Sequence, residues 1–345
     1  MSWPRTRITE LLGIRYPIVQ APMAGGPTTT ELVAAVSEAG GLGSVAGAAL
    51  PPDTLREVIR AVRARTARPF VVNLFAPLPP PAPAPGVVER MQKLLEPHRE
   101  RLGLGPPAAP APPPWTAADQ LAVVVEERVP AFSFTFGIPP LDAVRESGAK
   151  VLGTATNVAE AVELERAGVD VVVAQGAEAG GHRGTFLGSF EESLTGTLAL
   201  VPQVVDAVSV PVVAAGGIMD GRGIAAALAL GAAGAQLGTA FLFCPEAGVP
   251  EAHLRAIGEL GTFVTASGSG RPARGARTPL LVEIEASGVE VPPYPLQRAL
   301  LDDLRAASDD NGFFLGGQGA PLGRALPASE LVATLAREAE AALSG

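Results

Sequence analysis

The sequence has few of the residues that most often carry enzyme chemistry. Its 345 residues include one cysteine, three histidines and only two lysines. The single Cys244 excludes an intramolecular disulfide and a dithiol redox pair, and we predict that it is a small buried apolar side chain. Lys93 and Lys150 leave little room for a Schiff-base mechanism. No group of His, Cys, Asp and Glu has the spacing of metal ligands, so we predict no metal site.

The charge balance limits the partners of the chain. The formal net charge is −9, which argues against nucleic acid and against an anionic membrane surface as partners. The N-terminal stretch lacks the apolar core of a signal peptide, so we expect a cytoplasmic protein. One uncharged run, residues 223–243, is long enough to span a bilayer. Four glycines and Gln236 interrupt this run, and we predict a buried helix followed by a buried strand instead of a membrane span.

Eight short apolar runs alternate with helical patterns along the chain. They cover residues 17–23, 41–47, 69–75, 131–137, 150–156, 170–176, 211–217 and 234–243. Nearly continuous apolar character is typical of parallel strands that are buried on both faces. Because eight strand–helix units fill a closed barrel, we predict an α/β fold, the (β/α)8 TIM barrel. An open doubly wound sheet is the alternative, but "APMAGGPTTTE" after the first run lacks the G-x-G-x-x-G fingerprint.

Two segments are not needed for the barrel. Residues 76–118 contain "APLPPPAPAPG" and "GPPAAPAPPPWT", whose proline density favours extended chain. This insertion is either a disordered surface loop or a cover, because it leaves the carboxyl end of the third strand, where barrel active sites lie. We expect a barrel over residues 1–262. Residues 263–345 then form a C-terminal extension that packs near the active site as a lid.

The loops after the seventh and eighth strands suit a phosphate group. Gly217 follows the seventh strand, and Gly238 and Thr239 belong to the eighth. Phosphates in such barrels usually bind between these two loops. Backbone N–H groups at Gly217 and Gly238, with the Thr239 hydroxyl, would supply the donors.

Amide side chains at other strand positions suit a flat heterocycle. Asn73, Gln175 and Gln236 each offer a donor and an acceptor. The alternative is that these amides bond to the backbone, since an unpaired amide inside a barrel is costly. Met23, after the first strand, would support the face of an aromatic ring.

The stretch "VVVAQGAEAGGHRG" leads the sixth strand into a glycine-rich loop that carries His182. Glycine lets the backbone approach a ligand closely, and histidine titrates near neutral pH. A tight turn with a satisfied histidine is the alternative. Glu178 either orients the imidazole or is a solvated loop carboxylate. We interpret His98 and His253 as ordinary surface residues.

Several motifs, in order, resemble the nitronate monooxygenase family, formerly called 2-nitropropane dioxygenases. They are "GIRYPIVQAPMAGG", "PFVVNLF", "QGAEAGGHRG", "AAGGIMDGRGIAAALALGAAGAQLGTAF" and "GRPARG". The similarity covers essentially the whole chain and is greatest to the branch that acts on propionate 3-nitronate. The resemblance implies non-covalently bound FMN and matches His182 to the active-site histidine of the family. It matches these residues to flavin-binding positions: Met23, Asn73, Gln175, Gly180, Gly217, Gln236, Leu237, Gly238 and Thr239.

The resemblance also implies a reaction. Alkyl nitronates, with propionate 3-nitronate as the expected substrate, would be oxidised by molecular oxygen to a carbonyl compound and nitrite. A protonated His182 would stabilise the nitronate oxygens, whereas a neutral one would remove the α-proton of a nitroalkane. Tyr294 and the arginines of "GRPARGAR" are candidates for binding a substrate carboxylate. The alternative function is an FMN-dependent NAD(P)H:quinone or enoyl-thioester reductase, and the oligomeric state stays open, with a homodimer as one option.

Overall fold

The computed structural model describes residues 3–78, 82–107 and 114–344. Its centre is a parallel eight-stranded sheet with the order β1-β9-β8-β6-β5-β4-β3-β2. These strands are β1 Ile18–Gln20, β2 Gly43–Ala46, β3 Phe70–Phe75, β4 Ala131–Thr135, β5 Lys150–Ala155, β6 Val171–Gln175, β8 Val212–Ala215 and β9 Gly234–Leu237. Each lies within one of the eight apolar runs, as expected for strands covered on both faces.

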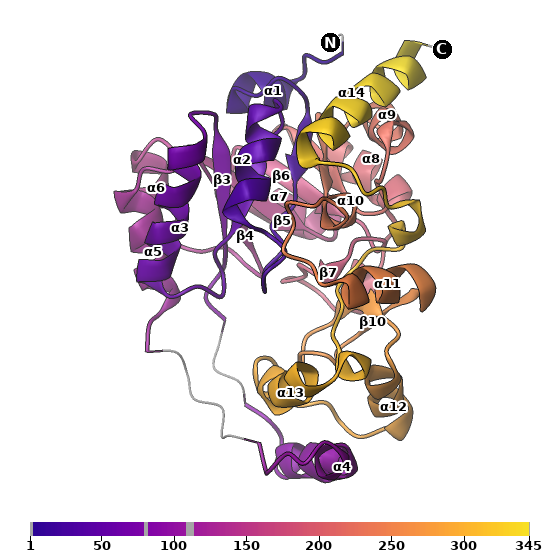
Figure 1. Cartoon of the computed structure of the whole chain (residues 1–345). Coiled ribbons are helices and arrows are strands. Elements are labelled where there is room, and N and C mark those ends of the chain that lie inside the picture. The colour runs from indigo at the N-terminus through magenta and orange to yellow at the C-terminus, as the bar shows by residue number, and fades with distance from the viewer. Residues whose placement is uncertain (1–2, 79–81, 108–113, 345) are drawn as a thin grey trace.

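The first and last strands of this order also meet, which closes the sheet. Leu42, just before β2, forms a parallel bridge with Val19 of β1. The Leu42 N–H donates to Ile18 O and the Gln20 N–H donates to Leu42 O, both at 2.9 Å. The predicted (β/α)8 barrel is therefore confirmed, and the open-sheet alternative is wrong. Figure 1 shows the strands surrounded by helices, with both chain ends at the same end of the barrel.

Helices pack around the outside of the strands. They are α2 Thr30–Glu38, α3 Pro52–Arg65, α5 Ala117–Glu126, α6 Asp142–Glu146, α7 Val158–Arg166, α8 Thr197–Ala207, α9 Gly221–Ala229 and α14 Ala328–Ser344. Local sequence signals set several starts: the side chains of Thr29, Asn157 and Asp220 accept N–H groups of the first turns of α2, α7 and α9. Such caps satisfy donors that a helix leaves free at its start.

Two layers of apolar side chains hold the barrel together. Alternate strand residues point inward, so that Val71, Val173 and Val213 share the inner cluster. Their neighbours point outward into the larger cluster between strands and helices. At the amino end of the barrel, helix α1 (Arg7–Leu12) places Ile8 in the inner cluster. The barrel is thus a filled core, and ligands can bind only at its carboxyl end or on its surface.

The eighth strand is shorter than predicted. We expected a strand over residues 234–243, but β9 ends at Leu237 and a short helix, α10, covers Thr239–Leu242. The apolar letters do not distinguish the two, since both segments are buried. The division of residues 223–243 into a helix, α9, and a following strand is as predicted. No helix in the described part of the chain combines the length and the apolar character of a membrane span.

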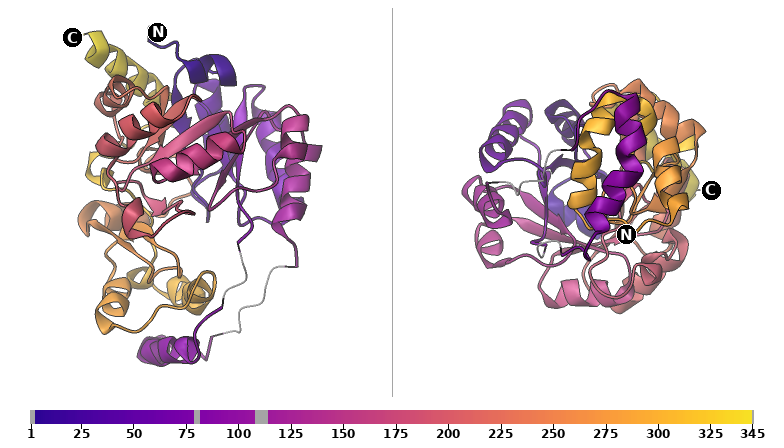
Figure 2. Two further views of the ribbon diagram at one scale, coloured as in Figure 1. Left: turned by 180° about the vertical axis from the view of Figure 1, so that it is seen from behind. Right: turned by 90° about the horizontal axis from the view of Figure 1, so that it is seen from below.

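A second layer lies against the carboxyl end of the barrel. Strands β7 (Gly181–His182), β11 (Ala273–Ala276) and β10 (Thr262–Thr265) form an antiparallel sheet. Helix α11 (Glu251–Glu259) packs beside it, against α10 and β11. Beyond the sheet lie α12 (Pro279–Ser287), α13 (Leu296–Ala307) and α4 (Val87–Arg101). Figure 1 shows α4, α12 and α13 together at the far end from the chain termini, and Figure 2 shows α4 between the orange helices when seen from below.

Helix α4 belongs to the proline-rich insertion. Its Met91 and Leu95 pack in one buried cluster with residues of α12 and α13. Arg99 of α4 forms an ion pair with Asp303, and His98 contacts Glu283 at 3.0 Å. A disordered loop is therefore wrong for residues 87–101, and His98 is buried instead of lying on the surface. The predicted insertion ended at residue 118, but α5 already begins at Ala117; residues 79–81 and 108–113 of the insertion lie outside the described residues.

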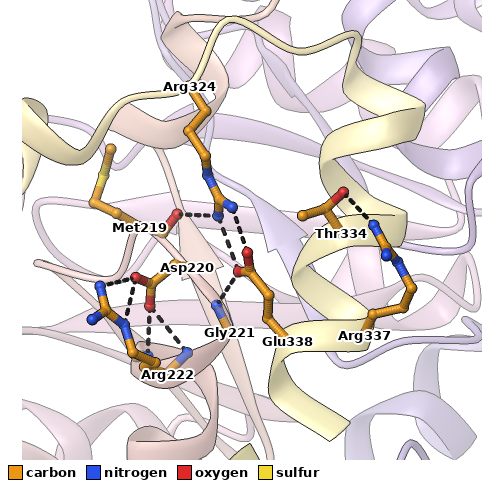
Figure 3. A network of polar contacts seen from close by, with 9 residues as sticks. Met219, Asp220, Gly221, Arg222, Arg324, Thr334, Arg337 and Glu338 are labelled. Carbon is orange, nitrogen blue, oxygen red and sulfur yellow. Dashed lines mark hydrogen bonds and ion pairs between the residues drawn. The ribbon is translucent and has the colours of Figure 1, made fainter. Parts of the chain in front are cut away.

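The end of the chain returns to the barrel. Helix α14 lies against α9 and α2, where the eighth barrel helix would be. Figure 3 shows how it is attached: Glu338 accepts from the Gly221 N–H at 3.0 Å and from Arg324 at 2.5 Å. Gly221 itself has no room for a side chain, because a Cβ there would lie 2.2 Å from that of Glu338. The boundary at residue 262 stays a prediction, but the C-terminal segment includes this barrel helix as well as the second layer.

Candidate functional site

The loop after β6 is held by the last side chain of that strand. The Gln175 amide donates to His182 O at 3.0 Å and accepts from the Gly184 N–H at 2.9 Å. Gln175 therefore bonds to backbone, the alternative considered for the amide residues. Its bonds place His182 at the carboxyl end of the barrel.

His182 lies on a strand and not in an irregular turn. In β7 it pairs with Ala273 of β11, and Gly181 pairs with Arg274. Gly181 has φ of +82°, a conformation that glycine adopts without strain. The glycine-rich loop thus joins the barrel to the antiparallel sheet, and the imidazole lies at their junction.

The buried side chain of Arg183 holds this loop through hydrogen bonds to backbone carbonyls. It is 1% exposed, and its guanidinium donates to the carbonyls of Gln175 at 2.8 Å, Gly176 at 2.7 Å and Ser193 at 2.7 Å. Burial and the nearby Arg274 lower the pKa of Arg183 to about 10, so it stays charged at neutral pH. The segment before His182 is therefore tied to a buried cation.

Three aromatic rings and a hydroxyl surround His182. The centroid of its imidazole lies 5.9 Å from that of Phe136, 6.0 Å from that of Tyr294 and 6.3 Å from that of Phe313, all edge to face. Its Nε2 lies 2.8 Å from Ser269 Oγ. The expectation that Tyr294 reaches the site from the tail agrees with this placement.

Ser269 lies between the imidazole and the Arg271 carbonyl. Its Oγ is 3.1 Å from that carbonyl and 2.8 Å from His182 Nε2. A hydroxyl has one proton; in the tautomer in which that proton goes to the carbonyl, Oγ accepts from Nε2–H and Nδ1 carries the lone pair. Burial, with the positive charges of Arg271, Arg298 and Arg305, lowers the pKa of His182 to about 3. The imidazole is neutral at pH 7, in the form that accepts a proton.

Glu178 does not orient the imidazole. Its carboxylate accepts from the Thr197 N–H at 2.8 Å and from the Thr197 hydroxyl at 2.8 Å. Thr197 is the first residue of α8, so Glu178 caps that helix from a distance. Neither of the roles considered from the sequence, imidazole partner or solvated carboxylate, describes it.

Two glycines matched to flavin-binding positions, Gly217 and Gly180, lie in one crowded region. A Cβ on Gly217 would lie 3.3 Å from that of Glu178, and a Cβ on Gly180 would lie 2.5 Å from Gly317 N. The Gly317 N–H in turn donates to the Thr239 hydroxyl at 2.9 Å. The ends of β6, β8 and β9 thus meet the C-terminal segment at this point. No acceptor for the N–H of Gly217 or of Thr239 occurs in the described parts of the chain.

The remaining candidate residues lie on the neighbouring strand ends. Asn73 of β3 is buried and donates to Ser133 Oγ of β4 at 2.9 Å. Gln236 lies in β9 between Val19 and Ala215 of the adjacent strands, and Leu237 is buried behind it. A Cβ on Gly238 would lie 4.0 Å from the sulfur of Met23. Met23, which follows β1, therefore lies beside the end of β9.

Other residues at the site were missed by sequence reasoning. Ser269, Phe136 and Phe313 approach His182 from segments far away in the chain. Ser269 precedes "GRPARG", and a hydroxyl beside a recognisable motif was the available signal. His253 was wrong as a surface residue, because it is buried and its Nε2 contacts Leu315 O at 2.8 Å. Cys244 is buried, as predicted.

Comparison with known proteins identifies related chains. The profile of the nitronate monooxygenase family matches residues 5–338. A probable nitronate monooxygenase of Staphylococcus saprophyticus is 44% identical over 315 residues, which are 89% of this chain and 88% of the relative. The crystal structure of nitroalkane oxidase from Streptomyces ansochromogenes is 40% identical, with a TM-score of 0.88, over 98% of this chain and 99% of that one. The structure of FabK from Thermotoga maritima is 34% identical, with a TM-score of 0.77, over 99% and 97% of the two chains.

Proposed function

This chain belongs to the nitronate monooxygenase family, and from that premise we propose that it uses FMN and molecular oxygen to oxidise alkyl nitronates, propionate 3-nitronate in particular, to a carbonyl compound and nitrite. The observation that carries the proposal is the position of His182 among three aromatic rings at the carboxyl end of the barrel, where barrel active sites lie. Its imidazole suits a neutral nitroalkane, which must lose a proton from carbon before it is a nitronate. The cytoplasmic location remains part of the proposal.

The residues at the ends of β8 and β9 suit the phosphate of FMN. The N–H groups of Gly217 and Thr239 are donors without an acceptor in the described residues, and they follow neighbouring barrel strands. Gly217 has φ of +73°, a backbone conformation that would be strained for an L-residue and that glycine adopts freely. One such cradle suits a mononucleotide better than a dinucleotide, which carries two phosphates. The proposed contacts to the ring are Met23, Asn73, Gln175, Gly180 and Gln236.

The flavin would supply the redox chemistry by taking electrons from the nitronate, and the protein supplies position and proton transfer. With Nε2–H donated to Ser269, His182 presents Nδ1 as the base for the α-proton of a neutral nitroalkane. Phe136, Tyr294 and Phe313 limit the water around the imidazole. Gln175 and Arg183 keep the loop in place while the proton moves.

The test is aerobic oxygen uptake with propionate 3-nitronate, together with nitrite release. The purified protein should be yellow and should release FMN, not FAD, on denaturation. The alternative reductase would instead bleach its flavin rapidly with NADH under anaerobic conditions. Oxygen uptake without a nitronate, or no uptake with one, would contradict the proposal.

His182→Asn tests the histidine. Asparagine cannot act as a base, so turnover of neutral nitroalkanes should fall by about 10²- to 10⁴-fold, the usual contribution of a general base. Pre-formed nitronates already lack the proton and should lose much less. The variant should remain yellow, because the flavin is held by other groups. Wild-type rates with both substrate forms would remove His182 from the mechanism.

A further inference from the structure

Positive charge gathers around His182 although the chain as a whole is acidic. The guanidinium groups of Arg271, Arg298 and Arg305 are the charges that act on the imidazole, whereas the formal net charge of the protein is −9. A local cationic region in an acidic protein attracts anions to one place on its surface. The question is which of the three arginines is free to bind one.

Two of the arginines share an acidic partner. Arg298 Nε lies 3.8 Å and Arg305 Nη1 lies 3.6 Å from the same Asp302 oxygen. Arg305 also donates to the Gly268 carbonyl and stacks over Phe313, with its Cζ 5.1 Å from the ring centroid. Arg305 therefore links α13 to the segment before Ser269, whereas Arg298 pairs with Asp302 within α13.

Arg271 is held differently. Its Cζ lies 3.9 Å from the centroid of the Phe136 ring, and one Nη donates to Thr185 O at 2.5 Å. Within residues 3–78, 82–107 and 114–344 it forms no ion pair. The carboxylate that most affects it, Glu160, is already bonded to the N–H groups of Thr156, Phe186 and Leu187. Of the five N–H donors of its guanidinium, one donates to an acceptor within the same described residues.

The ring beneath Arg271 is in a strained position. Phe136 has φ of +79°, which costs about 1–3 kcal/mol for a residue that is not glycine, and such outliers concentrate at functional sites. The same ring is buried and lies 5.9 Å from the imidazole of His182. Phe136 therefore contacts both groups: the guanidinium lies over its face, and the imidazole meets it edge to face.

We propose that Arg271 is the specificity-determining residue of the site, binding a carboxylate at the end of the substrate opposite to the nitronate group. This inference rests on the proposed function and adds to it the residue that selects short dianionic nitronates, such as propionate 3-nitronate, over monoanionic ones. His182 and Arg271 both contact the same Phe136 ring, at 5.9 Å and 3.9 Å from its centroid, which is why the proposed substrate has a short carbon chain. A planar guanidinium binds a carboxylate through two parallel N–H donors, which gives direction as well as charge.

The experiment compares two nitronates in the flavin-loaded enzyme. Propionate 3-nitronate carries the carboxylate, and propyl-1-nitronate has the same carbon chain length without it. Arg271→Gln should lower kcat/KM for propionate 3-nitronate by about 10- to 100-fold, mainly through KM, as expected for a lost hydrogen bond to a charged group. The value for propyl-1-nitronate should fall much less, because this substrate has no carboxylate for Arg271 to bind. Arg271→Lys, which keeps the charge but not the fork, should restore part of the difference.

Arg298→Gln is the matched control, because it removes a positive charge from the same region but from an arginine that already has an acidic partner. It should leave the ratio of the two kcat/KM values nearly unchanged. An equal loss for both nitronates in Arg271→Gln would overturn the inference, as would the same discrimination in Arg298→Gln. A wild-type enzyme that oxidises neither nitronate would instead refute the proposed function.

Discussion

Replacing Arg183 by methionine tests how the loop that carries His182 is held. Methionine has a similar length and no charge, so it removes three hydrogen bonds, to the carbonyls of Gln175, Gly176 and Ser193. The Gly176 carbonyl keeps the Ala179 N–H as a donor at 3.1 Å, so the carbonyls of Gln175 and Ser193 are the ones that lose their donor. Each such loss costs about 1–3 kcal/mol, or about 2–6 kcal/mol for the two. Against this, the lowering of the Arg183 pKa from 12.5 to about 10 means that the buried charge costs about 3 kcal/mol, at 1.36 kcal/mol per unit. The difference runs from about −1 to about 3 kcal/mol, and its middle predicts a destabilisation of about 1 kcal/mol.

Equilibrium urea unfolding at a fixed flavin concentration measures this change. Turnover should fall as well, because the backbone before His182 loses its anchor. Arg183→Lys is the comparison: it keeps the buried charge but cannot reach all three carbonyls, so it should be at least as unstable as the methionine variant. A methionine variant with a wild-type unfolding midpoint would refute the reasoning. A lysine variant more stable than methionine would show that charge, not hydrogen-bond geometry, is what the loop requires.

Three further predictions concern the cofactor, pH and the C-terminal helix. Gly217→Asp should weaken FMN binding, since it adds a side chain at a positive φ and a negative charge beside the proposed phosphate; unchanged affinity in a folded variant would place the phosphate elsewhere. The pKa of His182 is lowered from 6.5 to about 3, so the imidazole stays neutral when the pH falls below 6.5. The loss of kcat/KM for neutral nitroalkanes at acidic pH should therefore begin below pH 6.5. Because of the same shift, the unfolded chain binds a proton on His182 at a higher pH than the folded chain does. The stability contributed by His182 should therefore be present above pH 6.5 and be lost as the pH falls towards 3. A fall in kcat/KM centred at pH 6.5 that His182→Asn abolishes would contradict the shift. Glu338→Ala should destabilise the fold by about 1 kcal/mol through the lost partner of the Gly221 N–H. Arg337→Ala removes an exposed side chain that donates to Thr334 of its own helix, and it should leave the urea midpoint unchanged.

The local pattern of the sequence determined the barrel. All eight strands lie within the predicted apolar runs, because a parallel strand covered on both faces must be apolar throughout. Helix starts were readable for a similar reason: a cap such as Thr29 or Asn157 bonds within three residues of itself. The same locality explains one error. Residues 239–242 are as apolar as the strand before them, so nothing in the letters separates helix α10 from β9.

Contacts between distant segments were decided only by the tertiary structure. Ser269 meets His182 across 87 residues, and His98 meets Glu283 across 185. No periodicity in the sequence records such a pair. For this reason the interpretation of His98 and His253 as surface residues was wrong, since both are buried. The charge on Arg271 was visible in "GRPARGAR", but its place over the strained Phe136 ring was not. Residue types and local spacing indicate which elements form and which chemistry is available, whereas burial and neighbouring charge, which decide the protonation of His182, depend on how those elements pack.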